Sequence, residues 1–103
     1  LFPVSVAQAA YREGCRLAVH GKTAKAQRMW LKGLGEARRL GFPWDEARAL
    51  SALGRSLPPG SADRKQHLEK AIEIFARLGA AHDLGIAREA AGLARERELV
   101  VPR

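Results

Sequence analysis

Small and large apolar residues recur at helical spacing through the first third of this chain. Successive members of the series are 4, 3, 4, 5 and 4 residues apart: Ala10, Gly14, Leu17, Gly21, Ala26 and Trp30. Steps of three and four residues return to the same face of an α-helix, so the series predicts two helices that meet near Gly21. Such a pair cannot bury its apolar stripe alone and has to stack on neighbouring helices. The spacing therefore predicts a stacked helical array.

A second pair of helices follows the same arrangement. Its first helix carries Leu50, Leu53, Gly54 and Leu57, and its second carries Ala71, Phe75 and Leu78. The interval from Gly14 to Gly54 is 40 residues, and the interval from Trp30 to Phe75 is 45. Two connections, 40–44 and 57–61, contain the Gly and Pro residues that end helices and make turns.

A glycine on the first helix of each pair, with an alanine and an aromatic residue on the second, resembles the tetratricopeptide repeat. The matching positions are Gly14, Ala26 and Trp30 in the first pair and Gly54, Ala71 and Phe75 in the second. The family period is about 34 residues, and we attribute the longer intervals here to insertions in the two connections. The chain departs from the family at Leu17 and Leu57, where a tyrosine is usual, and it lacks the proline at the repeat ends.

The two glycines predict close helix contact. A glycine inside a helix costs about 1 kcal/mol relative to alanine, and close approach of the two backbones compensates for this cost. In the family an aromatic residue fills the space beside that approach. The resemblance thus implies that Trp30 and Phe75 are core residues beside Gly14 and Gly54.

The resemblance also implies the fold class, which is all-α, a right-handed α-α superhelix of about five antiparallel helices or two and a half hairpins. A single domain would cover residues 1–103, with a first hairpin at about 5–40, a second at 43–79 and a capping helix at 82–98. Segments 37–41, 53–54 and 67–80 are similar to a degenerate subclass found in multidomain bacterial regulators. The implied role is a scaffold or regulatory module that docks another protein or another domain of the same parent protein.

Local signals predict the helix boundaries and buried faces. Gly21, Gly41 and Gly79 are expected helix ends, Pro43 fits a first helical turn, and Ser61 is an expected N-cap. The predicted helices span about 5–20, 22 or 23–40, 43–57, 61–79 and 82–98. Their predicted inward residues are Val6, Ala10, Gly14 and Leu17 on the first helix, Ala26, Trp30, Gly33, Leu34 and Ala37 on the second, Leu68, Ala71, Ile72, Phe75 and Leu78 on the fourth, and Leu84, Ala87, Ala91 and Ala94 on the fifth.

The first helices of each pair line the concave face in this family, and this implies a set of partner-binding candidates: Gln8, Tyr11, Cys15, Arg48, Ser51 and Arg55. Tyr11 is amphipathic and rigid, while Arg48 and Arg55 offer planar donor groups that suit a carboxylate or phosphate. The Lys and Asn set with which tetratricopeptide proteins clamp a C-terminal carboxylate is absent at these positions, so we do not predict that activity. The alternative is a solvated helix face with no ligand.

Positive charge is concentrated in the first hairpin. The net charge is +7, and residues 1–42 account for +6 of it, with eight Lys and Arg against two Glu. Four cations at helical spacing lie opposite the Ala26 and Trp30 face: Lys25, Arg28, Lys32 and Arg39. This basic stripe, expected on the convex side, suits nucleic acid phosphates, anionic lipid or an acidic protein, or it only solubilises the domain. Nucleic-acid binding through the first hairpin is the alternative function, although no DNA-binding motif is recognisable.

The residue patterns of enzymes are missing from the sequence. Cys15 and His20 are five residues apart, about 140° around a helix, so they do not face each other as a nucleophile and its base. The three histidines, His20, His67 and His82, have no metal-ligand spacing, and no Gly-rich phosphate loop follows a strand. We therefore predict a binding module rather than an enzyme, with no cofactor and no metal.

Length and cysteine content narrow the setting. A chain of 103 residues with 47% hydrophobic content describes one compact domain. The single cysteine, Cys15, rules out an internal disulfide, and no apolar run approaches the roughly 20 residues of a membrane span, so a cytoplasmic location is expected. Because the chain starts at Leu rather than Met, we expect an excised or processed part of a longer protein. Self-association through an exposed terminal repeat is a further possible interaction.

Overall fold

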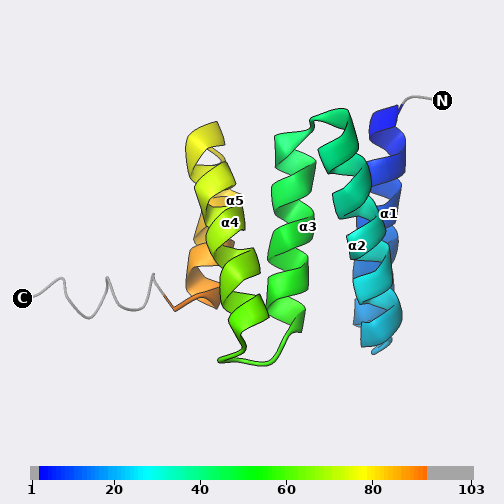
Figure 1. Ribbon diagram of the computed structural model, residues 1–103. Coiled ribbons are helices and arrows are strands. Elements are labelled where there is room, and N and C mark those ends of the chain that lie inside the picture. Colours follow the sequence, from blue (N-terminus) through cyan, green and yellow to red (C-terminus); the bar gives the residue numbers. More distant parts are fainter. Residues whose placement is uncertain (1–2, 93–103) are drawn as a thin grey trace, which may run out of the picture.

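Five α-helices follow one another with short turns between them (Figure 1). The computed structural model describes residues 3–92, with side chains from residue 6 onward. The helices are α1 (Pro3–Val19), α2 (Thr23–Leu40), α3 (Pro43–Ser56), α4 (Ala62–Leu78) and α5 (Ala81–Ala90). No strand occurs in the described part, and the all-α fold predicted from the sequence is confirmed.

The helix ends predicted at Gly21, Gly41, Ser61 and Gly79 are confirmed by their backbone geometry. Gly41 closes α2 with φ +73°, and the N–H of the following residue, Phe42, donates to the Ala37 carbonyl at 2.9 Å. This left-handed closure satisfies carbonyls that the helix leaves unpaired; Gly21 and Gly79 close α1 and α4 in the same way. Ser61 is the N-cap of α4, because its Oγ accepts a hydrogen bond from the Arg64 N–H at 3.1 Å.

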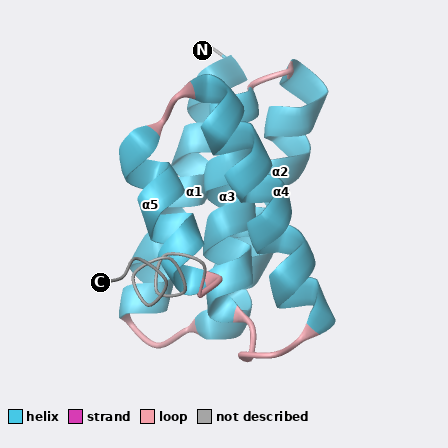
Figure 2. Ribbon diagram, turned by 90° about the vertical axis from the view of Figure 1, so that its left-hand side faces the viewer, coloured by secondary structure: helices cyan, strands magenta, loops and turns pink. Residues whose placement is uncertain are grey.

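The helices form two layers. Figure 2 shows α1, α3 and α5 on one side of the molecule and α2 and α4 on the other. Within the described chain, α3 contacts both α1 and α5, whereas α2 and α4 have no Cα atoms within 8 Å of each other. We call the layer of α1, α3 and α5 the inner layer and the layer of α2 and α4 the outer layer; the closest packing is between the layers, as in the pair of α1 and α2.

The core lies between the layers and is centred on α3. All five inward residues predicted for α2 are buried, among them Trp30 and Leu34. Seven residues of α3 are buried, because α3 contacts all four of the other helices. The largest fully buried side chains are Phe75, Leu50, Leu68 and Ile74.

One predicted core residue of α1 and one of α4 are exposed. Val6 is 42% exposed, and its neighbour Ala7 is buried instead, because Ala7 lies three residues before the buried Ala10 and faces α2 near Gly33. Leu78 at the end of α4 is 43% exposed, while Ile74 is buried. Since α4 contacts both α3 and α5, its buried face is turned toward Ile74.

The fifth helix is shorter than predicted. It ends at Ala90, and Ala91, expected to face inward, is exposed in the turn that follows. Gly92 has φ +83°, a left-handed conformation that interrupts the helix. Leu84 is half-buried and Ala87 fully buried, as predicted. Residues 93–98 of the predicted helix, with Ala94, lie outside the described residues.

Candidate functional site

A pocket of about 400 Å³ opens between α1 and α3. It is lined by side chains of both helices, by the start of α2 and by Trp30: Tyr11, Cys15, Ala18, Thr23, Trp30, Ala52, Arg55 and Ser56. Because α1 and α3 belong to the inner layer, the pocket lies on the face where the sequence places the partner-binding residues. We call it the inner groove.

Trp30 and Gly14 build the wall of the inner groove next to α1. A Cβ on Gly14 would lie 2.9 Å from Trp30 Cε2 and closer still to Nε1, so only glycine admits the indole here. The indole Nε1 donates to the Tyr11 carbonyl at 3.2 Å, which fixes Trp30 against α1. The predicted close approach at Gly14 is confirmed. At Gly54 the prediction is wrong in its partner, because Leu68 rather than Phe75 occupies the space beside the glycine.

Aromatic and charged side chains link the three inner helices above the groove. The Arg48 guanidinium carbon lies 4.0 Å from the Tyr11 ring centroid and 4.4 Å from that of Trp44. Trp44 in turn donates its Nε1 hydrogen to Asp83 Oδ2 at 3.0 Å. Tyr11 belongs to α1, Arg48 and Trp44 to α3, and Asp83 to α5. A guanidinium stacked on rings still directs N–H donors outward from its edge.

Burial dominates the electrostatics of the groove. The pKa of the Tyr11 phenol is raised above 10.0, first because burial disfavours the phenolate and then because Cys15 lies beside it, while Arg48 acts in the opposite direction. Burial likewise raises the pKa of Asp45, which Arg48 partly offsets. No described carboxylate lies within 4.0 Å of the guanidinium nitrogens of Arg48 or Arg55. Both arginines therefore retain positive charge without an internal ion pair in the described chain.

The structure brings four of the six predicted groove residues together. Tyr11, Cys15 and Arg55 line the pocket, and Arg48 stacks on Tyr11. Gln8 is half-buried on α1 and lies outside the pocket lining. Ser51 is only 4% exposed, so its assignment to the contact surface is wrong: α3 is the central helix, and this position faces its neighbours.

Sequence reasoning missed Trp44 and Asp83. Trp44 was counted both with the 40–44 connection and with the predicted 43–57 helix; α3 begins at Pro43, and this places Trp44 one turn before Arg48. An aromatic residue four positions before an arginine is a recognisable helical pairing. Nothing in the sequence indicates Asp83, since its contact with Trp44 spans 39 residues.

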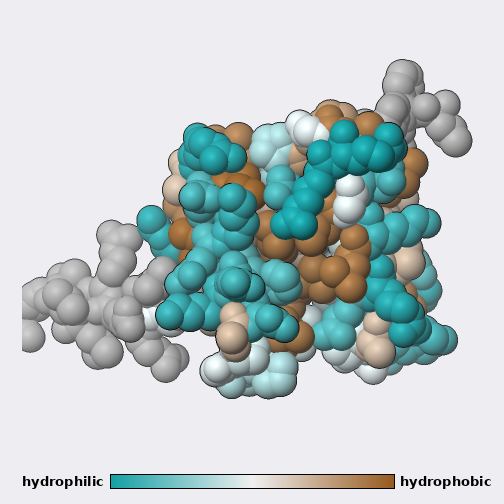
Figure 3. All heavy atoms as spheres, viewed as in Figure 1, coloured by the Kyte–Doolittle hydropathy of each residue, from teal (hydrophilic) through white to brown (hydrophobic). Residues whose placement is uncertain are grey.

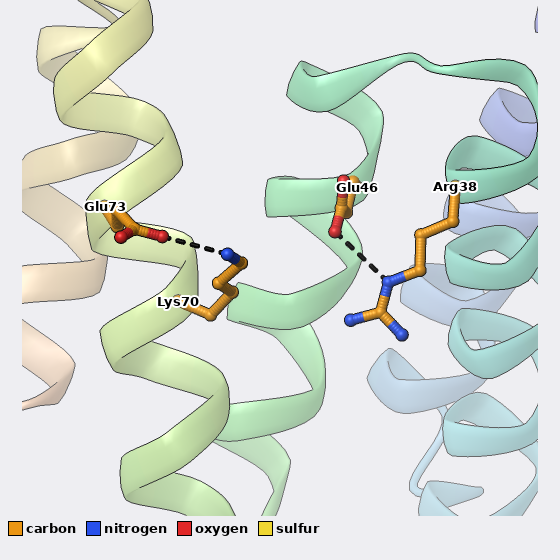
Figure 4. A network of polar contacts seen from close by, with 4 residues as sticks. All are labelled: Arg38, Glu46, Lys70 and Glu73. Carbon is orange, nitrogen blue, oxygen red and sulfur yellow. Dashed lines mark hydrogen bonds and ion pairs between the residues drawn. The ribbon is translucent and has the colours of Figure 1, made fainter.

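The basic stripe lies on the outer layer. Lys25, Arg28, Lys32 and Arg39 are all exposed on α2, but Arg39 is paired with Glu36 at 2.7 Å. Figure 4 shows two more ion pairs: Arg38 of α2 with Glu46 of α3 at 3.1 Å, which joins the two layers, and Lys70 with Glu73 on α4 at 3.0 Å. Figure 3 shows that hydrophilic residues cover α4 on this side and that a hydrophobic area lies between α4 and α2.

Other kinds of site find no support in the described residues. No group of three or more His, Cys, Asp or Glu residues in positions 3–92 is placed to hold a metal ion. None of the helices described combines the length and the apolar character that crossing a membrane needs.

Comparison of the chain with protein-family models, with curated proteins and with solved structures gives no match.

Proposed function

We propose that this chain is a non-catalytic interaction module that docks a segment of another protein, or of another domain of its parent protein, in the inner groove. The observation that carries the proposal is the pocket between α1 and α3, which has an indole wall and Arg55 in its lining, with Arg48 stacked on Tyr11 beside it; neither arginine has an internal ion pair among the described residues. The alternation of inner and outer helices favours a tetratricopeptide-like solenoid whose inner layer is concave. In this proposal the module acts in the cytoplasm as a scaffold or regulatory domain.

Docking would use the preformed walls of the groove. Apolar surface from Trp30, Ala18 and Ala52 accepts an apolar side chain, and Arg55 at the edge accepts a polar group. Because Trp30 is held by its hydrogen bond to Tyr11, binding does not have to order it. Preorganised walls of this kind reduce the entropic cost of association.

A displayed library of random peptides tests this function. The immobilised chain is expected to enrich a family of related sequences, and Ala18→Glu is expected to abolish their binding because it places a longer, charged side chain in the pocket. Ala24→Glu is the matched control, since Ala24 is exposed on α2 and lies outside the pocket. Failure to enrich any peptide, or enrichment that survives Ala18→Glu, contradicts groove docking.

Nucleic-acid binding is the second candidate, favoured by the exposed cations of α2. Lys25, Arg28 and Lys32 lie on one face without a described carboxylate within 4.0 Å. Binding through these cations predicts an affinity that falls steeply with salt, with a slope set by the number of phosphates contacted. Titration of a labelled oligonucleotide at several salt concentrations measures that slope, and a flat response excludes this function.

A further inference from the structure

The two arginines of α3 have a fixed spacing along the inner face. Arg48 and Arg55 are seven residues apart, so they lie on the same side of α3 with a rise of about 10.5 Å between them. Both side chains turn back by one helical turn: Arg48 stacks on Trp44, and Arg55 Nε donates to the Ser51 carbonyl at 3.3 Å. Because both bend in the same direction, their guanidinium groups keep roughly the separation of their backbones.

The contacts of Arg48 indicate which chemical group of a ligand it would bind. Ring stacking occupies a face of the Arg48 guanidinium, and its in-plane N–H donors match the two oxygens of a carboxylate. A long polyanion fits this face less well, because Asp45 and Asp83 lie beside the same stack and repel it. Charge complementarity therefore favours a short segment with two separate carboxylates.

The spacing of the two arginines fits an extended ligand. An extended chain in the polyproline II conformation has three residues per turn and advances about 3.1 Å per residue. Carboxylates three residues apart in such a chain lie on one side, about 9 Å from each other, which matches the arginine spacing.

We propose that the inner groove recognises an extended acidic peptide with two carboxylates three residues apart, one on Arg48 and one on Arg55, and an apolar side chain next to the second carboxylate in the pocket. This inference rests on the proposed function. Beyond the proposed function, the inference specifies the chemistry, the carboxylate spacing and the conformation of the partner segment.

Synthetic peptides test the spacing. A fluorescent peptide with two glutamates three residues apart, followed by a leucine, is compared with versions whose glutamates are two or seven residues apart and with the diglutamine version. We expect the three-residue spacing to bind about tenfold more tightly than the diglutamine peptide, because two charged hydrogen-bonded pairs are lost. Tightest binding at a spacing of seven indicates a helical ligand and overturns the proposal, as does equal binding of all four.

Variants of the protein assign each carboxylate to its arginine. Arg55→Gln is expected to weaken the diglutamate peptide about fivefold but leave a peptide that lacks the glutamate next to the leucine unchanged. Arg48→Gln is expected to show the same coupling with the other glutamate. Arg28→Gln on the outer layer removes an equal charge and is expected to have no effect. Thermal melts of each variant verify folding, and absence of coupling at both arginines refutes the assignment.

The outcomes separate this inference from docking itself. If the displayed library yields groove-binding peptides without paired acidic residues, the proposed function stands and the acidic motif is wrong. If no peptide binds at all, both are wrong. An unlabelled single-stranded oligonucleotide is also added at the same charge concentration as the peptide. If it displaces the fluorescent peptide, the inner face binds polyanions in general, and the proposed peptide motif is overturned.

Discussion

Single residues of the first hairpin are the best-predicted part of this chain. The resemblance to the repeat family implied that Gly14 and Trp30 lie in one contact, and the indole occupies the space that a Cβ would need. Such contacts are predictable because they join neighbouring helices of fixed period. The Trp44 to Asp83 hydrogen bond was not predictable, because it depends on how α5 returns to the inner layer. The burial of Ser51 was not predictable either, because it depends on how the other helices pack around α3.

The Gly14 contact predicts opposite effects for two similar substitutions. Gly14→Ala gains about 1 kcal/mol of helix propensity but forces the buried indole to move, at a cost of about 1–3 kcal/mol, so we expect a net loss of stability. Gly35 lies inside α2 and has nothing within 4 Å of an added Cβ, so Gly35→Ala is expected to gain up to about 1 kcal/mol. Urea unfolding of the two variants gives both values. A Gly14→Ala protein as stable as Gly35→Ala would refute the contact.

Tyr11 reports directly on the groove because it is the only tyrosine in the chain. Its pKa is raised, so its phenolate absorbance is expected to appear above pH 10.0 in the folded protein and near 10.0 in urea. With the folded pKa above the unfolded one, the stability contributed by this group is complete below pH 10.0 and is lost as the pH rises through the folded value. A phenol that titrates identically with and without urea would contradict its burial.

At the scale of elements, short-range chemistry decides the helix ends. Gly, Pro and Ser placed the ends of α1 to α4 correctly because caps and turns depend only on neighbouring residues. The predicted end of α5 is wrong. The helical spacing of alanines continues past Gly92, but the left-handed conformation of Gly92 interrupts the helix. The long-range contacts that hold the helix ends to each other were not visible in the sequence.

Arg64 of α4 holds the ends of α3 and α5 together. Its Nη1 donates to the carbonyls of Gly54, Arg55 and Leu57 at 3.0 to 3.2 Å, and its Nη2 donates to the Ala90 carbonyl at 3.0 Å. One cation thus satisfies the carboxyl ends of both α3 and α5, where the helix dipole favours positive charge.

Replacement of Arg64 is expected to loosen the second half of the array. Arg64→Lys keeps the charge but lacks the planar fork, so it cannot reach both helix ends, and we expect a loss of about 2 kcal/mol. Arg77→Lys, an exposed arginine of the same helix, is the control and is expected to change stability by less than about 0.5 kcal/mol. Chemical denaturation compares the two. Equal stabilities would mean that the four hydrogen bonds contribute nothing.

For the whole molecule, the alternation of helices between two layers separates two surfaces of different character. The inner groove combines apolar walls with Arg55, and Arg48 lies beside it on the Tyr11 ring, whereas the outer layer carries cations that are partly balanced by Glu36, Glu46 and Glu73. Net charge and its concentration in the first hairpin were readable from the sequence. Which cations are balanced was not, because ion pairs such as Arg38 with Glu46 cross between helices.

This separation predicts that the two surfaces can be disabled independently. Two layers of helices place the faces about 20 Å apart, more than twice the Debye length of about 8 Å at physiological salt, so charges on one face are screened from a ligand on the other. The double variant Arg48→Glu, Arg55→Glu is expected to lose peptide binding at least about tenfold and to leave any oligonucleotide binding unchanged. The variant Arg28→Glu, Lys32→Glu changes the net charge by the same amount and is expected to do the reverse. If both variants weaken both ligands equally, the overall positive charge attracts them, and neither surface is a specific site.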